Sequence, residues 1–230
     1  MTRWAEDYVA ALVAGFEANA DPFTAAPMQR YLRDQFPCLG ITSPRRRELA
    51  RDVRSGLARP TEADLVNLVR ALWRLTAREY QYVGSDEIRR HAKRLSPAFV
   101  AVVEELVTTK SWWDTVDALA VHGAGALVAA HPERRADMDR WLDSDDLWLR
   151  RSALLHQLLW RGRTDGDWLF AACRRRADDP DFFIRKAIGW ALREYSKTDA
   201  DAVGRFVAEH DGVLSPLSRR EALKRLTSTA

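Results

Sequence analysis

The sequence predicts an all-α protein whose helices stack as repeats into a solenoid. Apolar residues recur at three- and four-residue spacing along nearly the whole chain, and alternating apolar and polar runs are almost absent. A closely related segment returns after 35 residues, and the connections between apolar segments are short. Because no linker-like stretch interrupts the 230 residues, we expect one domain over residues 1–230.

The chain is expected to begin with an amphipathic helix. Glu6 and Asp7 lie within the first apolar stretch, which indicates a helix with one polar face and not a signal peptide. The same spacing continues along the chain and predicts about a dozen helices and no sheet. The helices are expected over residues 3–19, 23–36, 43–57, 61–74, 78–93, 96–109, 112–129, 133–142, 146–161, 165–177, 181–195, 199–210 and 215–227.

Several of these helices are preceded by residues typical of helix caps. Ser43 and Asp179 each stand directly before a proline, as a capping residue does before a first-turn proline. Ser111 stands three residues before Asp114, which resembles a capping box with Asp in place of the usual Glu. These residues support the helix starts predicted near positions 43, 112 and 181.

An internal repeat is most visible in the second half of the chain. DLWLRRSALL begins at Asp146, DFFIRKAIGW begins 35 residues later at Asp181, and SWWDTVDALA from Ser111 is similar. This register aligns three aromatic residues and two basic pairs, namely Trp113, Trp148 and Phe183, and Arg150-Arg151 with Arg185-Lys186. The pattern is typical of HEAT-like repeats, in which a helix pair buries its apolar face against the next pair. The prediction is a HEAT-like helical-repeat solenoid, an α-α superhelix; the alternative is chance similarity among amphipathic helices.

Arginine dominates the basic residues, with 31 arginines against five lysines and a net charge of +3. The excess concentrates in residues 30–60, with a net charge of +5, and residues 174–197, with a net charge of +3. The basic pairs come early in the second helices of the repeats, which usually line the inner side, so they predict a concave basic groove. Such a groove suits a nucleic-acid backbone and makes Arg150 and Lys186 candidate DNA contacts. The alternative explanation of the arginine content is that these residues lie on ordinary solvated helix faces and reflect a codon preference for arginine.

Other function classes are excluded by what the sequence lacks. No run of 18 apolar residues exists, so no membrane helix is expected. Cys38 and Cys173 do not make a disulfide framework, and the five histidines lack the paired spacing of a metal site. No Gly-rich phosphate loop or nucleophile elbow occurs. We therefore expect a cytoplasmic protein that uses neither a metal nor a cofactor.

One pair of residues is suited to chemistry. Trp113 and Asp117 lie four residues apart on one predicted helix and so share a face. An indole beside a carboxylate attracts a cationic centre, because both the ring face and the negative charge favour it. Arg151 and Trp190 fall in the next two repeats and are expected on the same groove. The alternative is structural, with two core tryptophans and a carboxylate in a helix ion pair.

Four segments carry a resemblance to a known family. They are FPCLGITSPRRRELA at residues 36–50, TTKSWWDTVD at 108–117, DLWLRRSALL at 146–155 and DFFIRKAIGWALREYSKTD at 181–199. These segments resemble the bacterial DNA alkylation repair family, the AlkD-like DNA glycosylases, whose early motif has the form FPxxGIxxPxRR. The resemblance extends over roughly residues 10–215.

The resemblance implies a HEAT-like solenoid that wraps duplex DNA. Members of the family excise positively charged alkylated purines, such as 3-methyladenine and 7-methylguanine, without a metal. Asp117 is implied as the catalytic carboxylate, with Trp113 and Trp190 contacting the deoxyribose. Arg151 is implied to hold the phosphate near the lesion. The further backbone contacts implied are Tyr31, Ser43 and Arg47.

The implied reaction needs only one carboxylate. A methylated purine already carries a positive charge and leaves as a neutral base, whereas glycoside hydrolases ordinarily need a second carboxyl group as acid. No lysine stands beside Asp117 in the sequence, so water is the expected nucleophile. We expect a monomeric, monofunctional alkylpurine DNA glycosylase of base excision repair, located at the bacterial nucleoid. The alternatives are a non-catalytic HEAT-like DNA-structure-binding protein and a protein–protein scaffold.

Overall fold

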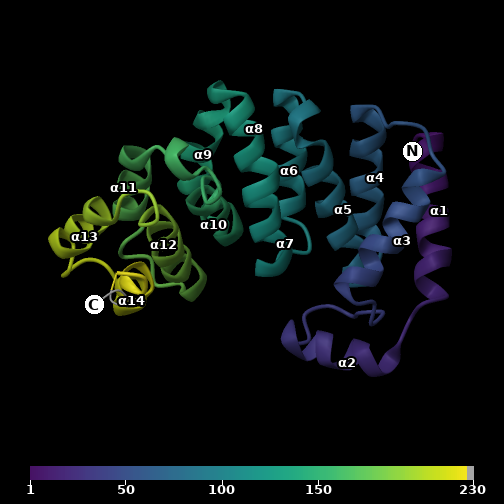
Figure 1. Cartoon of the computed structure of the whole chain (residues 1–230), viewed down its shortest axis with the longest axis horizontal. Coiled ribbons are helices and arrows are strands. Elements are labelled where there is room, and N and C mark those ends of the chain that lie inside the picture. Colours follow the sequence, from purple (N-terminus) through teal and green to yellow (C-terminus); the bar gives the residue numbers. More distant parts are fainter. Residues whose placement is uncertain (227–230) are drawn as a thin grey trace. The chain divides into compact units, whose positions relative to one another are not determined.

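The computed structural model describes residues 1–226 and shows helices but no strand in this range. The chain divides into two compact units, Met1–Ala98 and a second unit that begins at Phe99, and each is described by itself below. Within the first unit most helices lie side by side, while the helix that begins at Pro22 lies across one end of them (Figure 1). The predicted all-α helical-repeat architecture is confirmed. The single domain and the concave basic groove stay predictions.

The first unit contains α1 (Arg3–Glu17), α2 (Pro22–Tyr31), α3 (Ser43–Ser55), α4 (Glu62–Arg74) and α5 (Arg78–His91), followed by the 3₁₀ turn η1 (Ala92–Arg94). Helix α1 packs against α3 and α4, and α4 packs against α5. The apolar faces of these helices enclose a core that includes Tyr8, Leu12, Phe16, Leu68 and Leu72. Burial of such side chains contributes roughly 1.5–3 kcal/mol each, which explains why their three- and four-residue spacing specifies the helices.

The loop between α2 and α3 is fixed by the first residues of α5. The buried Glu79 carboxylate accepts hydrogen bonds from the backbone N–H groups of residues 39–41 at 2.9–3.2 Å. Gly40 has a φ of +87°, and a Cβ there would overlap the Asp21 carbonyl, so only glycine fits. The FPCLGI segment therefore has a structural role, because it fixes the path of the chain into α3.

The second unit contains most of the repeat. Its elements are α6 (Val100–Val107), preceded by η2 (Pro97–Phe99), α7 (Trp113–Ala118), the π-helical turn η3 (Leu119–Ala124), α8 (Gly125–Ala130), η4 (Pro132–Arg134), α9 (Arg135–Leu142), α10 (Leu147–Leu155), η5 (Arg161–Arg163), α11 (Gly166–Arg175), α12 (Phe182–Tyr195), α13 (Ala200–Glu209) and α14 (Pro216–Leu223). Among residues 1–226, no helix combines the length and the apolar character needed to span a membrane.

The predicted helix over residues 112–129 is present as α7, η3 and α8 in direct succession. The helix predicted over residues 146–161 ends earlier, at Leu155. Beyond it the chain turns back on itself, and the Gln157 side chain accepts a hydrogen bond from the Asp165 N–H at 2.7 Å. Backbone N–H groups after Leu155 donate to carbonyls three residues earlier, as Leu158 does to Leu155 at 3.0 Å, so the α-helical bonding pattern ends there.

The 35-residue repeat is confirmed by equivalent contacts at the starts of α10 and α12. Asp146 and Asp181 cap these helices, each accepting from backbone N–H groups of the first turn. Arg150 and Arg185, four residues after each cap, both donate at 2.9 Å to the backbone carbonyl six residues earlier. The same side chains therefore close the same turn in successive repeats.

Three predicted caps are wrong by one or two residues. Ser43 is already the first helical residue of α3 and makes no cap hydrogen bond. Asp181 caps α12, while the Asp179 carboxylate accepts from the Asp181 N–H at 3.0 Å and shapes the turn before it. The Ser111 hydroxyl donates at 2.6 Å to a carbonyl at the end of α6, and α7 begins after Trp112 without a side-chain cap. Ser111 and Asp179 bond to nearer backbone groups, whereas the Ser43 hydroxyl accepts from Nη1 of Arg46 at 3.4 Å.

Candidate functional site

Asp117 and Arg151 form a bidentate ion pair inside the second unit. Nε of Arg151 lies 2.7 Å from Oδ1 of Asp117, and Nη2 lies 2.8 Å from Oδ2. The remaining Nη1 donates to the Phe183 carbonyl at 2.6 Å. The Arg151 side chain is 4% exposed and the Asp117 side chain 15%. Side chains and backbone of α7, α10 and α12 thus meet at one guanidinium, in the short fork-to-fork geometry of strong ion pairs.

The pair forms because both residues occupy the same level of neighbouring helices. Asp117 follows the N-cap residue of α7, Trp112, by five positions, and Arg151 follows the N-cap of α10, Asp146, by five. Helix α7 packs directly against α10. The N-caps are 34 residues apart, so the sequence register that aligns Trp113 with Trp148 is wrong by one residue at this step.

An aromatic cluster lies beside the ion pair. The rings of Trp112, Trp148 and Phe183 have centroid separations of 5.0–5.7 Å in edge-to-face and tilted arrangements. The guanidinium carbon of Arg151 lies 5.7 Å from the centroid of the Phe183 ring. Trp112, the N-cap residue of α7, therefore contacts aromatic residues of the next two repeats. Trp113 is half-buried at the first position of α7, one turn before Asp117.

The surroundings of Asp117 act on its acidity in opposite directions. Burial raises the pKa of Asp117 above its ordinary value, while the hydrogen bonds and charge of Arg151 lower it. The nearby Asp114 adds to the rise in the pKa of Asp117. The net direction is upward, which gives a carboxylate that is more basic than one in water. Such a group is suited to orienting water or to stabilising positive charge.

Trp190 lies half-buried on α12, at a place where α14 approaches closely. At the preceding Gly189, a Cβ would lie 2.5 Å from the Glu221 Cβ and 2.8 Å from the Ser218 carbonyl. The Glu221 carboxylate lies 2.7 Å from Nζ of Lys186. Lys186, expected to contact DNA, therefore already has an acidic partner on α14.

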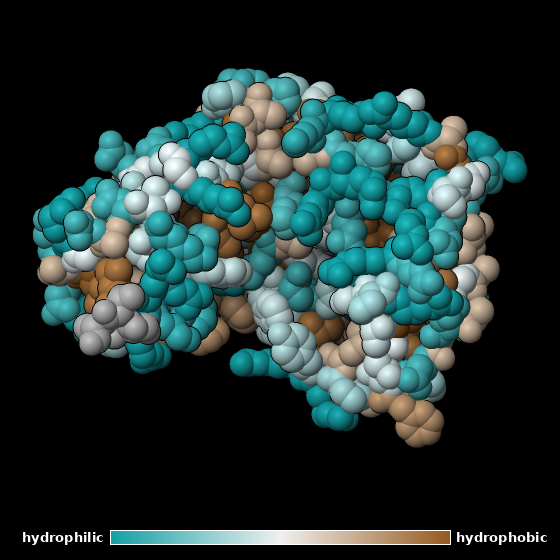
Figure 2. All heavy atoms as spheres, viewed as in Figure 1, coloured by the Kyte–Doolittle hydropathy of each residue, from teal (hydrophilic) through white to brown (hydrophobic). Residues whose placement is uncertain are grey.

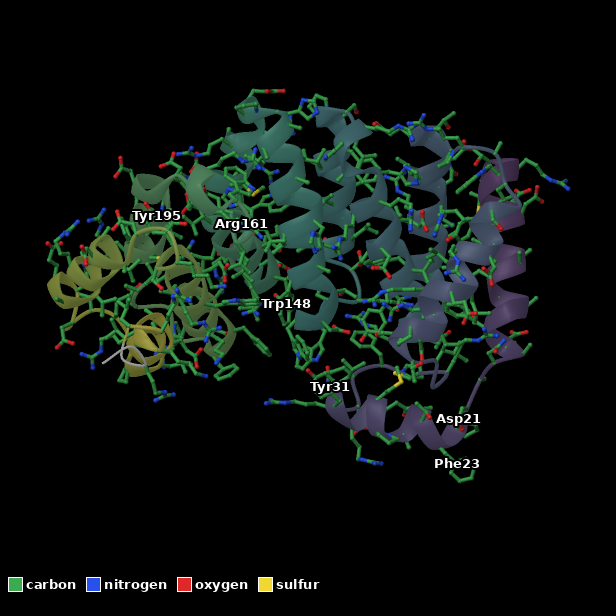
Figure 3. The ribbon with its side chains drawn as sticks, in the orientation of Figure 1. Asp21, Phe23, Tyr31, Trp148, Arg161 and Tyr195 are labelled. Carbon is green, nitrogen blue, oxygen red and sulfur yellow. The ribbon has the colours of Figure 1, made fainter. Side chains whose placement is uncertain are left out.

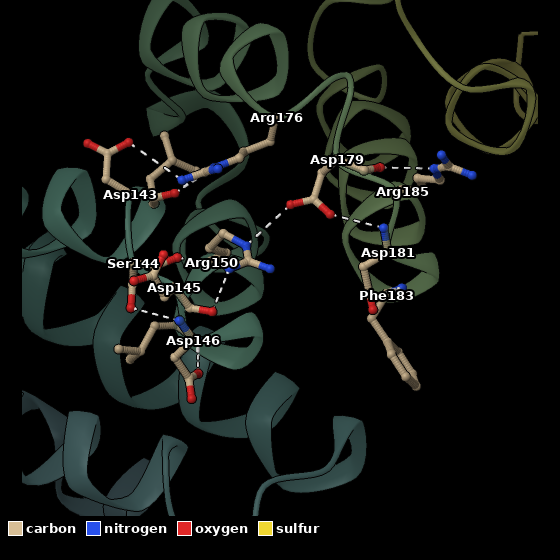
Figure 4. A network of polar contacts seen from close by, with 12 residues as sticks. Asp143, Ser144, Asp145, Asp146, Arg150, Arg176, Asp179, Asp181, Phe183 and Arg185 are labelled. Carbon is tan, nitrogen blue, oxygen red and sulfur yellow. Dashed lines mark hydrogen bonds and ion pairs between the residues drawn. The ribbon is translucent and has the colours of Figure 1, made fainter.

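Arg150 is held by the turns before α10 and α12 (Figure 4). Its Nη1 donates to the carbonyls of Ser144 and Asp145 at 2.9 and 2.8 Å, and its Nε lies 3.2 Å from the Asp179 carboxylate. The Arg150 side chain is 16% exposed. These contacts give Arg150 a role in the fold, and its contact with DNA stays a prediction.

The other candidate residues lie in the first unit and are exposed. Tyr31 ends α2 and is 70% exposed (Figure 3). Ser43 and Arg47 lie one turn apart on α3, so they share a face of that helix. The exposure of these three side chains is compatible with contacts to a large partner.

A basic cavity of about 420 Å³ lies between α3 and α5. Its lining residues are Arg47, Ala50, Arg54, Asp86, Glu87, Arg89 and Arg90. Arg54 is paired with Glu87 at 2.5 Å, whereas the guanidinium groups of Arg47, Arg89 and Arg90 make no hydrogen bond or ion pair with residues 1–226. Hydrophilic side chains cover this part of the surface (Figure 2). The cavity therefore presents cationic groups that are available to phosphate.

The sequence pattern of the DNA alkylation repair enzyme family matches residues 12–226 of this chain. The chain belongs to this family. It is also similar to a structure described as a predicted DNA alkylation repair enzyme from Enterococcus faecalis, with 36% sequence identity and a TM-score of 0.83. That similarity covers 90% of this chain and 96% of the other. No curated protein matches the sequence.

Family membership makes the protein an enzyme of DNA alkylation repair, with DNA as its partner. Sequence reasoning missed Arg89 and Arg90 as cationic residues of this enzyme. The sequence does contain a signal, because Arg89 and Arg90 are an adjacent basic pair like Arg150 and Arg151. The pair at 89–90 stands near the end of its predicted helix, whereas the pair at 150–151 stands early in its helix. Trp112 was also missed, because the 35-residue repeat aligns its neighbour Trp113 with Trp148.

Metal and thiol chemistry have little support in the enzyme's described residues. Among residues 1–226, no three His, Cys, Asp or Glu side chains gather in an arrangement suited to a metal ion. Cys38 and Cys173 are buried, and burial raises the pKa of Cys173, which disfavours the reactive thiolate. Chemistry without a metal or a cofactor stays a prediction.

Proposed function

We propose that the protein is a monofunctional DNA glycosylase that excises positively charged alkylated purines, such as 3-methyladenine and 7-methylguanine, from duplex DNA. One observation carries the proposal: Asp117 is a half-buried carboxylate that Arg151 holds at both oxygens. It stands one turn from Trp113 on the same helix. The enzyme acts as a monomer in base excision repair, in the bacterial cytoplasm.

The chemistry follows from the charge of the substrate. The alkylated base leaves as a neutral molecule, so the barrier lies in the positive charge that develops on the sugar. Asp117 stabilises that charge and orients the attacking water, and its raised pKa strengthens its interaction with a proton or a cation. The indoles of Trp113 and Trp190 add cation–π attraction to the same sugar.

Water is the nucleophile in this proposal. No lysine stands beside Asp117 in the sequence. A lysine nucleophile would form a covalent intermediate with the sugar and allow strand cleavage. We therefore propose base release without a lyase step, with DNA held by Tyr31, Ser43 and Arg47 in the first unit.

A second candidate is a DNA-structure-binding protein without catalysis. It is favoured by the same ion pair, because both oxygens of Asp117 already accept hydrogen bonds from Arg151. In that case the pair is a structural link between α7 and α10. The two candidates differ in what happens to a damaged base, and one assay separates them.

The test is release of free base from duplex DNA that contains 7-methylguanine, in the presence of EDTA. Asp117→Asn should lower the rate about 10²–10³-fold while DNA affinity is kept, because it removes one charge that acts in the transition state. Asp114→Asn, on the same helix but outside the pair, is the matched control and should stay within a few-fold of wild type. Salt-sensitive DNA binding without any base release would establish the second candidate instead.

A further inference from the structure

A further cavity lies in the second unit, where α10, α11 and α12 meet. Its volume is about 260 Å³, just below the range of roughly 300–1,000 Å³ that is typical of sites for drug-sized ligands, so it suits a smaller molecule. Arg161 of η5 and Tyr195 of α12 both line it (Figure 3). Its apolar wall consists of buried aliphatic side chains, namely Leu154, Leu158, Leu169 and Ala191.

Gln157 contributes a buried hydrogen-bond donor that has no acceptor. The residue lines the cavity and is 4% exposed. Its Oε1 accepts from the Asp165 N–H at 2.7 Å, which fixes the orientation of the side-chain amide. Its Nε2 is buried and makes no hydrogen bond within residues 1–226. Because a buried donor without an acceptor is unfavourable, Nε2 is suited to an oxygen atom of a bound molecule.

The charged side chains that line the cavity are Arg161, Lys197 and Glu194. Nζ of Lys197 lies 2.6 Å from the Glu194 carboxylate, so these two charges balance each other. The Arg161 guanidinium is exposed and makes no hydrogen bond or ion pair with the described residues. One available guanidinium matches one carboxylate, which it binds through two parallel hydrogen bonds. A phosphate dianion would need a second cation.

The backbone of Arg161 has an uncommon conformation for an arginine. Its φ of +55° lies in the left-handed region, where a side chain is unfavourable and glycine is not. Residues held in this way are found most often at ligand-binding and catalytic sites. Since the guanidinium makes no contact that stabilises the fold, its position at the cavity points to a ligand.

We propose that this cavity binds a small monocarboxylate with an aliphatic body and a carbonyl oxygen. Arg161 holds the carboxylate, and Nε2 of Gln157 donates to the carbonyl oxygen. The aliphatic body packs against the leucine side chains of the apolar wall. The site goes beyond the proposed glycosylase function, because none of the residues assigned to that function lines the cavity.

The test titrates nitrogen-15-labelled protein with N-acetyl-leucine, which combines a carboxylate, a carbonyl group and a branched aliphatic chain. The side-chain amide resonances of Gln157 should shift and saturate in the millimolar range expected for a molecule of this size. N-acetyl-leucinamide is uncharged and should bind about tenfold more weakly, because it makes no charge-assisted hydrogen bond with Arg161. Absence of a saturable shift at Gln157 would overturn the inference.

Arg161→Gln is compared with Arg163→Gln, which changes an exposed arginine of the same turn that does not line the cavity. Arg161→Gln should bind the acid about tenfold more weakly and no longer distinguish the acid from the amide. Arg163→Gln should keep both the affinity and the preference of wild type. A wild-type preference for the acid in Arg161→Gln would remove Arg161 from the site and overturn the inference.

Two further variants separate ligand binding from the fold. Arg161→Gly should lose the same affinity for the acid while its thermal stability does not fall, because glycine adopts the positive φ without strain. Gln157→Glu keeps an oxygen for the Asp165 N–H but replaces the donor by a second carboxylate oxygen, so the acid should no longer bind. Where Gln157→Glu does not fold, Arg161→Gly decides, and wild-type affinity in that variant overturns the inference.

Undamaged duplex DNA distinguishes this cavity from the DNA-binding surface. Saturating DNA should leave the affinity for N-acetyl-leucine unchanged, and Arg161→Gln should keep the wild-type slope of DNA affinity against salt. Displacement of N-acetyl-leucine by DNA, together with a flattened slope in Arg161→Gln, would assign the cavity to the DNA interface and overturn the inference. None of these measurements depends on base release, so failure of the glycosylase proposal would leave their outcome unaffected.

Discussion

Three arginines of the second unit differ from two arginines of the first unit in what they bind. In the second unit, Arg150, Arg151 and Arg185 donate to carbonyl oxygens and carboxylates of the protein itself. In the first unit, Arg47 and Arg90 line an open cavity and make no such contact with residues 1–226. Position along the helix distinguishes Arg150 and Arg185 from Arg90. It does not distinguish Arg151 from Arg47, because each of these stands five residues after its N-cap. Arginines four residues after an N-cap reach back to the preceding turn, whereas Arg90 stands at the end of α5, beyond such a turn. A count of arginines therefore overstates the cationic surface available to DNA.

The largest effect that tests this comparison is expected at Arg150. Arg150→Ala removes two hydrogen bonds to carbonyl groups and leaves the buried Asp179 carboxylate without its cation. We expect a loss of about 3–5 kcal/mol in the free energy of unfolding, as for removal of one partner from a buried pair. Urea denaturation measures it. Arg47→Ala is the control and should change stability by less than about 0.5 kcal/mol. Equal stabilities of the two variants would contradict the assignment of Arg150 to the fold.

The pH dependence of the free energy of unfolding extends the comparison to a buried histidine of the second unit. Arginines keep their charge in acid, whereas this histidine resists protonation. His156 packs between the rings of Trp160 and Trp168, and burial lowers its pKa to about 4 from 6.5. Between these two values the unfolded chain binds a proton that the native state does not. The stabilising contribution is complete above pH 6.5 and falls as the pH decreases toward 4, by about 3 kcal/mol in total.

Urea titrations at several pH values test this prediction. His156→Gln should flatten the fall in stability between pH 6.5 and 4. The partly exposed His131→Gln serves as the control and should retain the fall. His91 of the first unit, whose pKa burial also lowers, contributes a background that is common to both variants. An undiminished fall in His156→Gln would mean that another group is responsible.

A smaller effect is expected at the exposed arginines of the first unit. Arg90→Gln should weaken DNA binding at all sequences and flatten the salt slope by about one unit, because one phosphate contact is lost. Its thermal stability should match wild type, since its guanidinium makes no hydrogen bond with the described residues. A filter-binding series at increasing salt measures the slope. An unchanged slope would remove the cavity between α3 and α5 from the DNA interface.

The smallest effect is expected at Glu221, which pairs with Lys186 and Arg193 at 2.7 Å. Glu221→Gln keeps the shape of the side chain but removes its charge, so Lys186 becomes more available to phosphate. We expect DNA affinity to rise a few-fold, with a steeper salt dependence. The control Glu209→Gln changes a carboxylate of α13 that makes no ion pair within residues 1–226. An affinity that falls in Glu221→Gln would show that α14 supports DNA binding through the pair.

The helices were predictable from sequence because packing selects the three- and four-residue spacing that a sequence displays directly. Helix ends were less predictable. Ser111 and Asp179 have the composition of caps, yet nearer backbone groups take their side chains. The site was predictable in part. The shared face of Trp113 and Asp117 follows from spacing on one helix.

Asp117 and Arg151 occupy equivalent positions of two helices whose N-caps are 34 residues apart. The repeat seen in the sequence has a period of 35 residues, so it does not align these two residues. A slip of one residue between neighbouring helices is set by packing, so it is not visible in either sequence segment alone. The pairing of Lys186 with Glu221 shows the same limit. Those residues stand 35 apart, but only the approach of α14 to Gly189 reveals that they meet.

The hydrogen bonds of Glu79 have a consequence for the order in which the chain acquires structure during synthesis. The carboxylate bonds to backbone groups 38–40 residues earlier in the chain. Translation delivers the FPCLGI segment first and Glu79 later, so until α5 has left the ribosome these N–H groups lack their native acceptor. The turn that leads into α3 therefore gains these hydrogen bonds late, and a nascent chain that stops before residue 79 carries the motif without the carboxylate that binds it.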